Sequence, residues 1–360
     1  MNTNKSWAIV LAAGEGTRLR ELTTRGGKAT PKQFCSLRGG RSLLGDALAR
    51  AARVVPKKRI VVVVAEEHRE FWAHEFAALP PENVVVQPAN KGTAAGILLP
   101  LSAVLERDPE AKVAVLPSDH FVAREYVLES SLRLALESLD ELDDAITLLG
   151  ITPDAPETGY GWIVPAQSQK ILRPIERFVE KPEATLANQL FARGGVWNSF
   201  LFAARGASLL AHIERRIPAL TTRFRSAFAA GSSSRSARLA ELYAGLDSHD
   251  FSRHVLEGSE ERLRLEIVPP CGWTDLGTPA RVAACLRHAG VEAQTRDLDA
   301  GPSPILARSL IAARGGYGTK RIESPFEVLK NAPPAAGSRN QPWKFQVEPE
   351  TIWPPAGKLP

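Results

Sequence analysis

The chain has 360 residues, enough for one large α/β domain or two smaller ones. Hydrophobic residues make up 44% and charged residues 24%, which is ordinary for a folded globular protein and excludes a low-complexity or fibrous chain. The formal net charge is +5, but Lys and Arg are scattered, so the charge indicates small phosphorylated ligands rather than a nucleic-acid-binding surface.

The first 150 residues alternate between short β-branched runs and longer helical patterns. Strands separated by helices predict a mostly parallel sheet with helices on both faces, and ligands of such sheets bind beyond the carboxyl ends of the strands. The expected strands are 8–12, 60–64, 84–86, 113–116 and 145–149, and the expected helices are 43–54, 66–79, 93–105 and 122–139.

The pattern changes after Glu157. Antiparallel additions to the sheet are predicted at 160–164 and 171–178, with further strands at 196–203 and 263–268. Helices are predicted at 207–217, 221–246 and 279–288. We expect one domain over 1–300, with a first half of about 1–150 and a second half of about 151–300. The extension 301–360 is rich in Pro, Gly and Ala and is expected to be extended or partly disordered.

A loop after the first strand carries a strong chemical signal. The stretch 11–34, LAAGEGTRLRELTTRGGKATPKQF, places Gly14 and Gly16 just past a buried run. Glycines there let backbone N–H groups approach an anion, and Arg18 and Lys32 can add positive charge. The stretch fits neither the dinucleotide fingerprint nor the P-loop, so it predicts a phosphate-binding loop of another kind. The alternative is an ordinary strand-to-helix turn.

Two further loops follow strands of the first half. The stretch 87–96, QPANKGTAAG, combines amide side chains with a helix N-terminus and could read the edge of a base, although a simple capped loop explains it equally well. Asp119, in the sequence LPSDH, is well placed for Mg²⁺ or could cap the next helix. His120 fits a structural role as well as a catalytic one.

Four segments of the second half extend the pattern: ETGYGWI at 157–163, FVEKP at 178–182, GVWNSF at 195–200 and GWTDLG at 272–277. Glycines and aromatic residues can border a sugar ring, whereas Glu-Lys-Pro alone is a common approach to a helix. In their order from residue 8 to about 290, these motifs and the first-half loops resemble those of the sugar-1-phosphate nucleotidyltransferases. Within that family the resemblance is to the mannose-1-phosphate guanylyltransferases.

This resemblance implies a Rossmann-like (GT-A type) α/β fold with a nucleotidyltransferase catalytic domain over 1–300. It implies that the protein transfers a guanylyl group from GTP to mannose 1-phosphate and forms GDP-mannose and pyrophosphate. The sugar phosphate would attack the α-phosphate in line, without a covalent intermediate. Mg²⁺ is the implied cofactor, with Asp119 and Asp275 as its ligands. The implied catalytic residues are Arg18, Lys32, Asp119 and Asp275.

The resemblance also assigns ligand-binding residues. Those implied to bind the nucleotide are Leu11, Ala13, Gly14, Gly16, Thr17, Arg18, Lys32, Gln87, Asn90, Gly92, Thr93 and Asp119. Those implied to bind the sugar phosphate are Tyr160, Gly161, Glu180, Lys181 and Asn198. Gln87, Asn90 and Thr93 would recognise guanine. The segment 250–256 is assigned no functional residue.

Two positions depart from the family pattern and leave alternatives open. Trp162 replaces a tyrosine and Phe200 replaces a glycine, so the hexose is uncertain on this basis. The protein could instead be an NDP-sugar pyrophosphorylase with another base or hexose, for example dTTP or UTP with glucose 1-phosphate. It could also be a non-catalytic nucleotide-sugar-binding regulatory protein, although the charged residues that the resemblance assigns are all present.

Cysteine content and hydropathy bear on the cellular compartment. Cys35, Cys271 and Cys285 are widely spaced and odd in number, so they predict neither a disulfide framework nor a zinc site, and we interpret them as small packed residues. No stretch approaches a membrane span. We expect a cytoplasmic protein with small-molecule substrates, no nucleic-acid partner and no membrane partner. A homodimer is compatible with the sequence.

Overall fold

The computed structural model describes residues 5–25, 27–37, 40–73, 75–142, 144–228, 235–288 and 343–344. The chain forms two compact units. Unit 1 is Met1–Glu15 with Leu44–Trp273, and unit 2 is Gly16–Leu43 with Thr274–Pro360. The expected division of the domain into halves near residue 150 falls inside unit 1. The extension 301–360 lies outside the described residues, apart from Trp343–Lys344.

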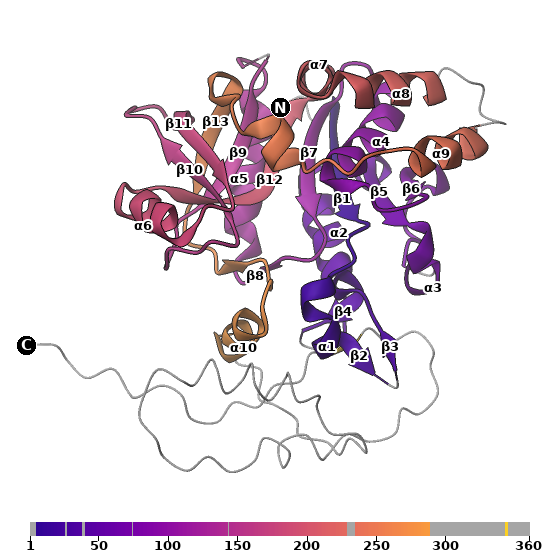
Figure 1. Ribbon diagram of the computed structural model, residues 1–360, viewed down its shortest axis with the longest axis horizontal. Helices are drawn as coiled ribbons and strands as arrows, with labels where there is room; N and C mark the ends of the chain where they lie inside the picture. The colour runs from indigo at the N-terminus through magenta and orange to yellow at the C-terminus, as the bar shows by residue number, and fades with distance from the viewer. Residues whose placement is uncertain are drawn as a thin grey trace, which may run out of the picture. The chain divides into compact units, whose positions relative to one another are not determined.

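Unit 1 is built on a mixed sheet, drawn in Figure 1. Among the described residues this sheet has nine strands. Their spatial order is β10 (Gly161–Pro165), β11 (Arg173–Glu180), β13 (Leu263–Val268), β9 (Ile146–Ile151), β12 (Val196–Arg205), β7 (Lys112–Pro117), β1 (Ser6–Ala12), β5 (Ile60–Ala65) and β6 (Val84–Gln87). Each of these strands overlaps a run that the sequence predicts, so the expected α/β class is confirmed.

Strands β7, β1, β5 and β6 are mutually parallel neighbours. Their carboxyl ends therefore meet at one edge of the sheet, where Leu11 of β1 pairs with Pro117 of β7. The residues of β5 and β7 are buried along their whole length, as expected for strands covered on both faces. This edge is followed by the loops that the sequence analysis predicts to bind the nucleotide.

The other strands mix both directions. Strand β12 enters antiparallel between β7 and β9, and β10 and β11 form an antiparallel pair, which confirms the additions predicted in the second half. Strand β13 runs parallel to β9. The register of β12 shifts between Asn198 and Phe202, which marks a bulge in that strand.

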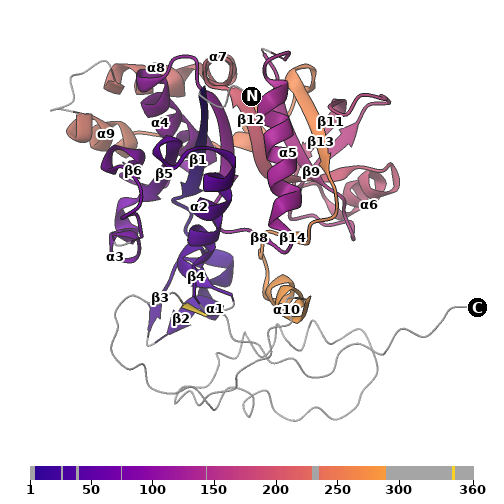
Figure 2. The same ribbon diagram turned by 180° about the vertical axis from the view of Figure 1, so that it is seen from behind.

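Helices cover both faces of the sheet. Helix α4 (Gly92–Arg107) packs on β1, β5 and β6, and α5 (Glu125–Ser138) packs on β9, β12 and β13. Figure 2 shows α5 in front of the sheet, and α7 (Gly206–Arg216) contacts α4 and β12. The other helices of unit 1 are α2 (Leu43–Val54), α3 (Arg69–Trp72), α6 (Ala184–Ala192), α8 (Pro218–Phe228) and α9 (Arg235–Ala244).

Two predicted helices are shorter than expected. The helix predicted over 66–79 is a 3-10 turn (Glu66–His68) followed by the four-residue α3, and the Trp72 indole N–H donates to the Ala65 carbonyl. The helix predicted from residue 122 begins at Glu125, because Phe121–Val122 form the short strand β8.

A large apolar core lies where α4 and α7 pack against the sheet, with α8 packed on these two helices and α9 on α8. It joins Leu98 of α4, Leu209 of α7 and Phe224 of α8 to Phe202 of β12. Phe251 belongs to the same core and is followed by a π-helix, η8 (Ser252–Leu256). The second half of the chain is thereby packed onto the helix that begins at the predicted base-binding loop.

Unit 2 consists of short elements. These are the 3-10 turn η2 (Thr17–Leu19), α1 (Arg20–Thr23), the hairpin of β2 (Thr24–Arg25) and β3 (Lys28–Ala29), the 3-10 turn η3 (Lys32–Phe34), β4 (Cys35–Ser36), α10 (Pro279–His288) and β15 (Trp343–Lys344). Strand β15 pairs in parallel with β4.

The cysteines and the helices agree with two interpretations from the sequence. The three cysteines are buried, and burial raises the pKa of the Cys35 thiol to about 12, as for packed residues rather than nucleophiles. In the part of the chain that the structure describes, no helix has both the length and the apolar character of a membrane span.

Candidate functional site

Three loops of unit 1 meet at the carboxyl edge of the parallel strands. The loop after β1 carries Ala13 and the exposed Gly14, and Leu11 lies near the end of the strand. The Ser118 amide after β7 donates to the Leu11 carbonyl over 3.1 Å. Asn90, in the loop after β6, donates from Nδ2 to Glu15 Oε1 over 3.1 Å. The structure therefore brings the start of the phosphate loop into contact with both neighbouring loops.

The loop after β6 is held by its own polar side chains. Asn90 Oδ1 accepts from the Gly92 amide at 3.1 Å. Thr93 Oγ1 accepts a hydrogen bond from the Phe251 amide at 2.7 Å, so this oxygen helps to hold the segment at Phe251. The hydroxyl hydrogen of Thr93 can still be donated. Gln87 is 2% exposed, and its Oε1 has no hydrogen-bond partner among the described residues. A buried acceptor that has no hydrogen-bond donor lowers the stability of the folded protein.

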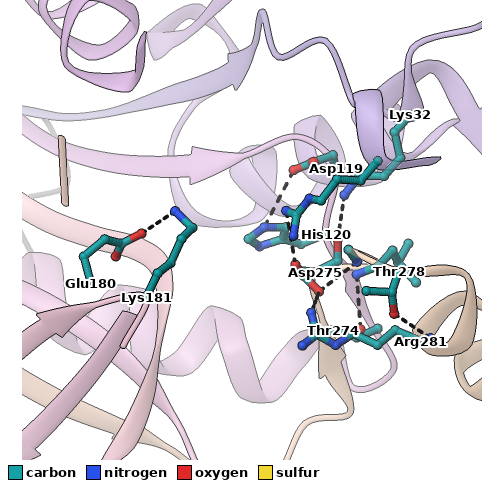
Figure 3. A network of polar contacts seen from close by, with 12 residues as sticks. Lys32, Asp119, His120, Glu180, Lys181, Thr274, Asp275, Thr278 and Arg281 are labelled. Atoms are coloured by element: carbon teal, nitrogen blue, oxygen red, sulfur yellow. Dashed lines mark hydrogen bonds and ion pairs between the residues drawn. The ribbon is translucent and has the colours of Figure 1, made fainter. Parts of the chain in front are cut away.

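Asp119 follows β7, as the sequence predicts, with its side chain about one-third exposed. Its Oδ1 lies 3.7 Å from Nε2 of His120 (Figure 3). The His120 ring packs edge-on against Trp273, with ring centroids 5.2 Å apart. His120 is therefore built into an aromatic contact, while the Asp119 carboxylate reaches solvent.

Glu180 and Lys181 lie together at the end of β11. Lys181 Nζ donates to Glu180 Oε1 at 2.5 Å, as Figure 3 shows. Lys181 has a left-handed backbone, with φ of 48°, and its amide donates to the Tyr160 carbonyl. Gly161 packs so close to this pair that a Cβ there would lie 2.6 Å from Glu180 Oε2, so only glycine leaves room for the carboxylate.

The Glu180 carboxyl group has an altered ionisation. Burial raises its pKa, and the nearby Asp250 carboxylate adds to this effect. The hydrogen bond and positive charge of Lys181, and the charge of Arg253, act in the opposite direction. Burial is the largest of these causes, so the net pKa is raised above its usual value.

Replacing Glu180 with glutamine is expected to stabilise the fold at pH 7. Because the folded-state pKa is raised, the ionised carboxylate opposes folding above that pKa, and the opposition disappears as the pH falls through it toward 4.5. Urea unfolding of the wild type and Glu180→Gln at about pH 7 and about pH 4 measures the difference, which should shrink at the lower pH. A variant less stable than the wild type at pH 7 would contradict this burial argument.

Aromatic residues surround the rest of the predicted sugar-binding residues. The Tyr160 ring lies 4.8 Å from Trp197 and 5.5 Å from Trp273, measured between centroids. Asn198, next to Trp197 on β12, is 7% exposed, and its Oδ1 accepts from the Phe200 amide at 3.1 Å. Unit 1 thus brings all five predicted sugar-phosphate-binding residues to neighbouring ends of β10, β11 and β12.

Unit 2 groups the predicted triphosphate-binding residues around Asp275. Gly16 precedes η2, in which Thr17 and the exposed Arg18 lie. An Arg18 nitrogen is 3.9 Å from Asp275 Oδ2. Lys32 is buried, and its Nζ donates to the Asp275 carbonyl at 2.6 Å (Figure 3). Arg18 therefore faces the Asp275 carboxylate and Lys32 holds its backbone carbonyl, and Asp275 is itself 8% exposed.

Arg281 is a member of this group that the sequence interpretation missed. Its Nη1 donates to Asp275 Oδ1 at 2.9 Å, and the Gly277 amide donates to the same oxygen at 2.8 Å. Arg281 lies in the first turn of α10, six residues after Asp275. A positively charged residue one helical turn beyond the GWTDLG motif was therefore the sequence feature that could have identified Arg281 as a partner of Asp275.

The carboxylates of Asp119 in unit 1 and of Asp275 in unit 2 are each of the kind that Mg²⁺ binds. Among the described residues, no group of three or more His, Cys, Asp or Glu side chains could hold a metal ion alone. Mg²⁺ commonly binds one or two protein carboxylates and takes its other ligands from phosphates and water. The partly exposed Asp119 suits that role, and Asp275 supplies a second carboxylate of the same chemistry. Asp119 belongs to unit 1 and Asp275 to unit 2, so their sharing of one ion stays a prediction.

The fold defines an α/β protein in which the predicted phosphate-binding and base-binding loops follow the carboxyl ends of parallel strands, the edge where ligands of such sheets bind. Residues 7–287 match the model of one protein family, described as nucleotidyl transferase. The chain belongs to this nucleotidyl transferase family, whose members transfer a nucleotidyl group.

Relatives and solved structures agree with this membership. The chain is 31% identical to the xanthan biosynthesis protein XanB of Xanthomonas campestris pv. campestris over 75% of its length, and 30% identical to a mannose-1-phosphate guanylyltransferase of Escherichia coli K12 over 77%. These matches span 57% and 59% of the two relatives, so the chain covers less than three-fifths of their length. A Thermus thermophilus structure, described as a mannose-1-phosphate geranyltransferase, is 28% identical with a TM-score of 0.68, covering 82% of this chain and 83% of that one.

Proposed function

We propose that this protein transfers a guanylyl group from GTP to mannose 1-phosphate and releases pyrophosphate. The family membership supports the reaction class, and the named relatives that include a mannose-1-phosphate guanylyltransferase support the substrates. The observation that carries the guanine assignment is the similarity to a mannose-1-phosphate guanylyltransferase of Escherichia coli K12, which is 30% identical over 77% of this chain.

The chain's own residues would bring two polyanions together. Arg18 and Lys32 would hold the triphosphate, and Lys181 would hold the attacking phosphate. The attacking oxygen is already an anion, so the reaction needs no general base, and positioning and positive charge supply the rate acceleration. Glu180 and Asn198 would bind sugar hydroxyls, with the aromatic residues beside them excluding water.

Mg²⁺ is proposed as the cofactor, with Asp119 and Asp275 as the residues that would hold it. When bound, such an ion neutralises charge on the phosphate oxygens. Arg281 would keep the Asp275 carboxylate oriented through its hydrogen bond to Oδ1.

The experiment is a pyrophosphate-release assay on the full chain with Mg²⁺, each of the four common NTPs, dTTP, and either mannose 1-phosphate or glucose 1-phosphate. Turnover is expected with GTP and mannose 1-phosphate. Turnover only with dTTP or UTP and glucose 1-phosphate would overturn the guanylyl assignment and leave the family membership intact. Thermal stabilisation by these ligands without turnover of any pair would instead favour a nucleotide-sugar-binding regulatory protein.

A further inference from the structure

Phe200 has a backbone conformation that a phenylalanine rarely adopts. Its φ is 61°, and it lies in the bulge where the register of β12 shifts. A side chain at this φ strains the backbone, and glycine would relieve the strain. Such strain persists only where surrounding contacts hold it, and it occurs preferentially at functional sites.

The ring of Phe200 belongs to a cluster of three phenyl rings. It lies edge-on to Phe202 at 6.4 Å and to Phe251 at 6.1 Å, measured between centroids. Phe202 and Phe251 stack on each other at 5.2 Å with an interplanar angle of 8°. Phe202 and Phe251 are buried and Phe200 is half-buried, so the ring of Phe200 packs on a rigid pair.

The backbone of Phe200 holds the predicted sugar-binding amide. Its N–H donates to Asn198 Oδ1 at 3.1 Å, which fixes the orientation of that carboxamide and leaves its NH₂ group as a donor. A change in the backbone at residue 200 would therefore turn the amide.

Phe251 of this ring cluster also contacts the predicted base-binding loop. The Phe251 amide donates to Thr93 Oγ1 at 2.7 Å. Two residues earlier, the His249 amide donates to the Lys91 carbonyl at 3.3 Å, and the His249 carbonyl accepts from the Ala94 amide at 3.0 Å. The segment that carries Phe251 is therefore fastened to the start of α4 by three hydrogen bonds.

We infer that Phe200 is a positioning residue that couples Asn198 to the base-binding loop through Phe251. The contacts run from Asn198 through the Phe200 backbone, the ring cluster and the Phe251 amide to Thr93. Each link is a contact within unit 1. The strained φ is maintained because the ring locks the sugar-binding strand onto the segment that supports the base loop. This inference rests on the proposed function, since it assigns the two ends to sugar phosphate and nucleotide.

The test measures both substrates in Phe200→Ala. We expect the Kd of GTP alone, by calorimetry with Mg²⁺, and the KM of mannose 1-phosphate each to rise roughly tenfold. Phe200→Tyr keeps the ring and should stay within about twofold of the wild type. The matched control is Phe228→Ala, which removes another half-buried ring from the same core, at the end of α8, and should leave both constants unchanged.

A second variant approaches the coupling from the other end. Phe251→Leu keeps an apolar side chain beside the base loop and is expected to raise the KM of mannose 1-phosphate severalfold, although Phe251 makes its polar contact with Thr93. It also provides the measurement if Phe200→Ala does not fold.

Three results would overturn the inference. The first is a Phe200→Ala variant in which only the KM of mannose 1-phosphate changes. The second is a Phe200→Ala variant that loses thermal stability as Phe228→Ala does, while the Kd of GTP and the KM of mannose 1-phosphate are unchanged. The third is a Phe251→Leu variant with an unchanged KM of mannose 1-phosphate. Wild-type protein is assayed in parallel. If it uses another nucleotide and sugar phosphate, the proposed function fails, and the same variants measured with that pair still decide the coupling.

Discussion

Replacing Asp275 with asparagine is expected to lower the rate of nucleotidyl transfer at least about a hundredfold while the chain stays folded. Asparagine keeps the shape of the side chain and an oxygen that can accept from Gly277 and Arg281. It removes the negative charge that faces Arg18 at 3.9 Å. The lower transfer rate should therefore result from the changed charge around the transferring phosphate rather than from altered packing.

The measurement is kcat at saturating GTP, mannose 1-phosphate and Mg²⁺, with circular dichroism and a thermal melt to verify folding. The matched control is Asp140→Asn, which removes an exposed carboxylate that pairs with Lys112 at 2.5 Å on the other unit. Its kcat should equal that of the wild type. An Asp275→Asn variant within fivefold of the wild type would remove Asp275 from the transfer machinery.

The elements with strong local periodicity could be predicted from the sequence. Helix α2 (Leu43–Val54), strand β13 (Leu263–Val268) and helix α10 (Pro279–His288) have the bounds that the sequence predicts. In each case apolar periodicity and its end points are contained in the segment itself. The position of β12 between β7 and β9 could not be predicted this way, because strand order depends on contacts between distant segments.

The candidate site likewise contains contacts that could be predicted from the sequence and contacts that could not. The contact between Glu180 and Lys181 could be predicted because the two residues are adjacent in sequence, while their role in binding stays a prediction. The fastening of His249 to Lys91 joins residues 158 positions apart, and nothing in either segment indicates it. The unusual character of position 200 could be predicted only in part. The departure from the family glycine is visible in the sequence, but only the φ of 61° shows why a glycine would suit that position.

Replacing Gly92 with alanine is expected to weaken GTP binding at least about tenfold and to destabilise the fold by more than its backbone strain alone. The φ of Gly92 is 81°, which costs a residue with a Cβ about 1–2 kcal/mol. A Cβ would also lie 2.4 Å from the His249 carbonyl oxygen and 2.8 Å from the His249 N. Backbone atoms cannot rotate away as a flexible side chain can, so the loop or the segment at His249 must shift.

Such a shift breaks the contacts that hold the base-binding loop. The hydrogen bonds of His249 with Lys91 and Ala94 lie on either side of Gly92 and require the present spacing. Asn90 would lose its bond to the residue 92 amide if the loop moved. The nucleotide would then meet a loop whose amide groups are no longer fixed, which is why we expect the loss in GTP affinity rather than in stability alone.

Gly194→Ala separates the two causes. Gly194 has a φ of 75°, close to that of Gly92, but a Cβ there would have no atom within 4 Å. It should therefore lose stability through backbone strain only and bind GTP as the wild type does. Calorimetric Kd values for GTP and urea unfolding of both variants give the comparison. If Gly92→Ala matches Gly194→Ala in both measurements, contact with His249 does not position the loop, and the assignment of nucleotide binding to Asn90 and Thr93 loses its structural support.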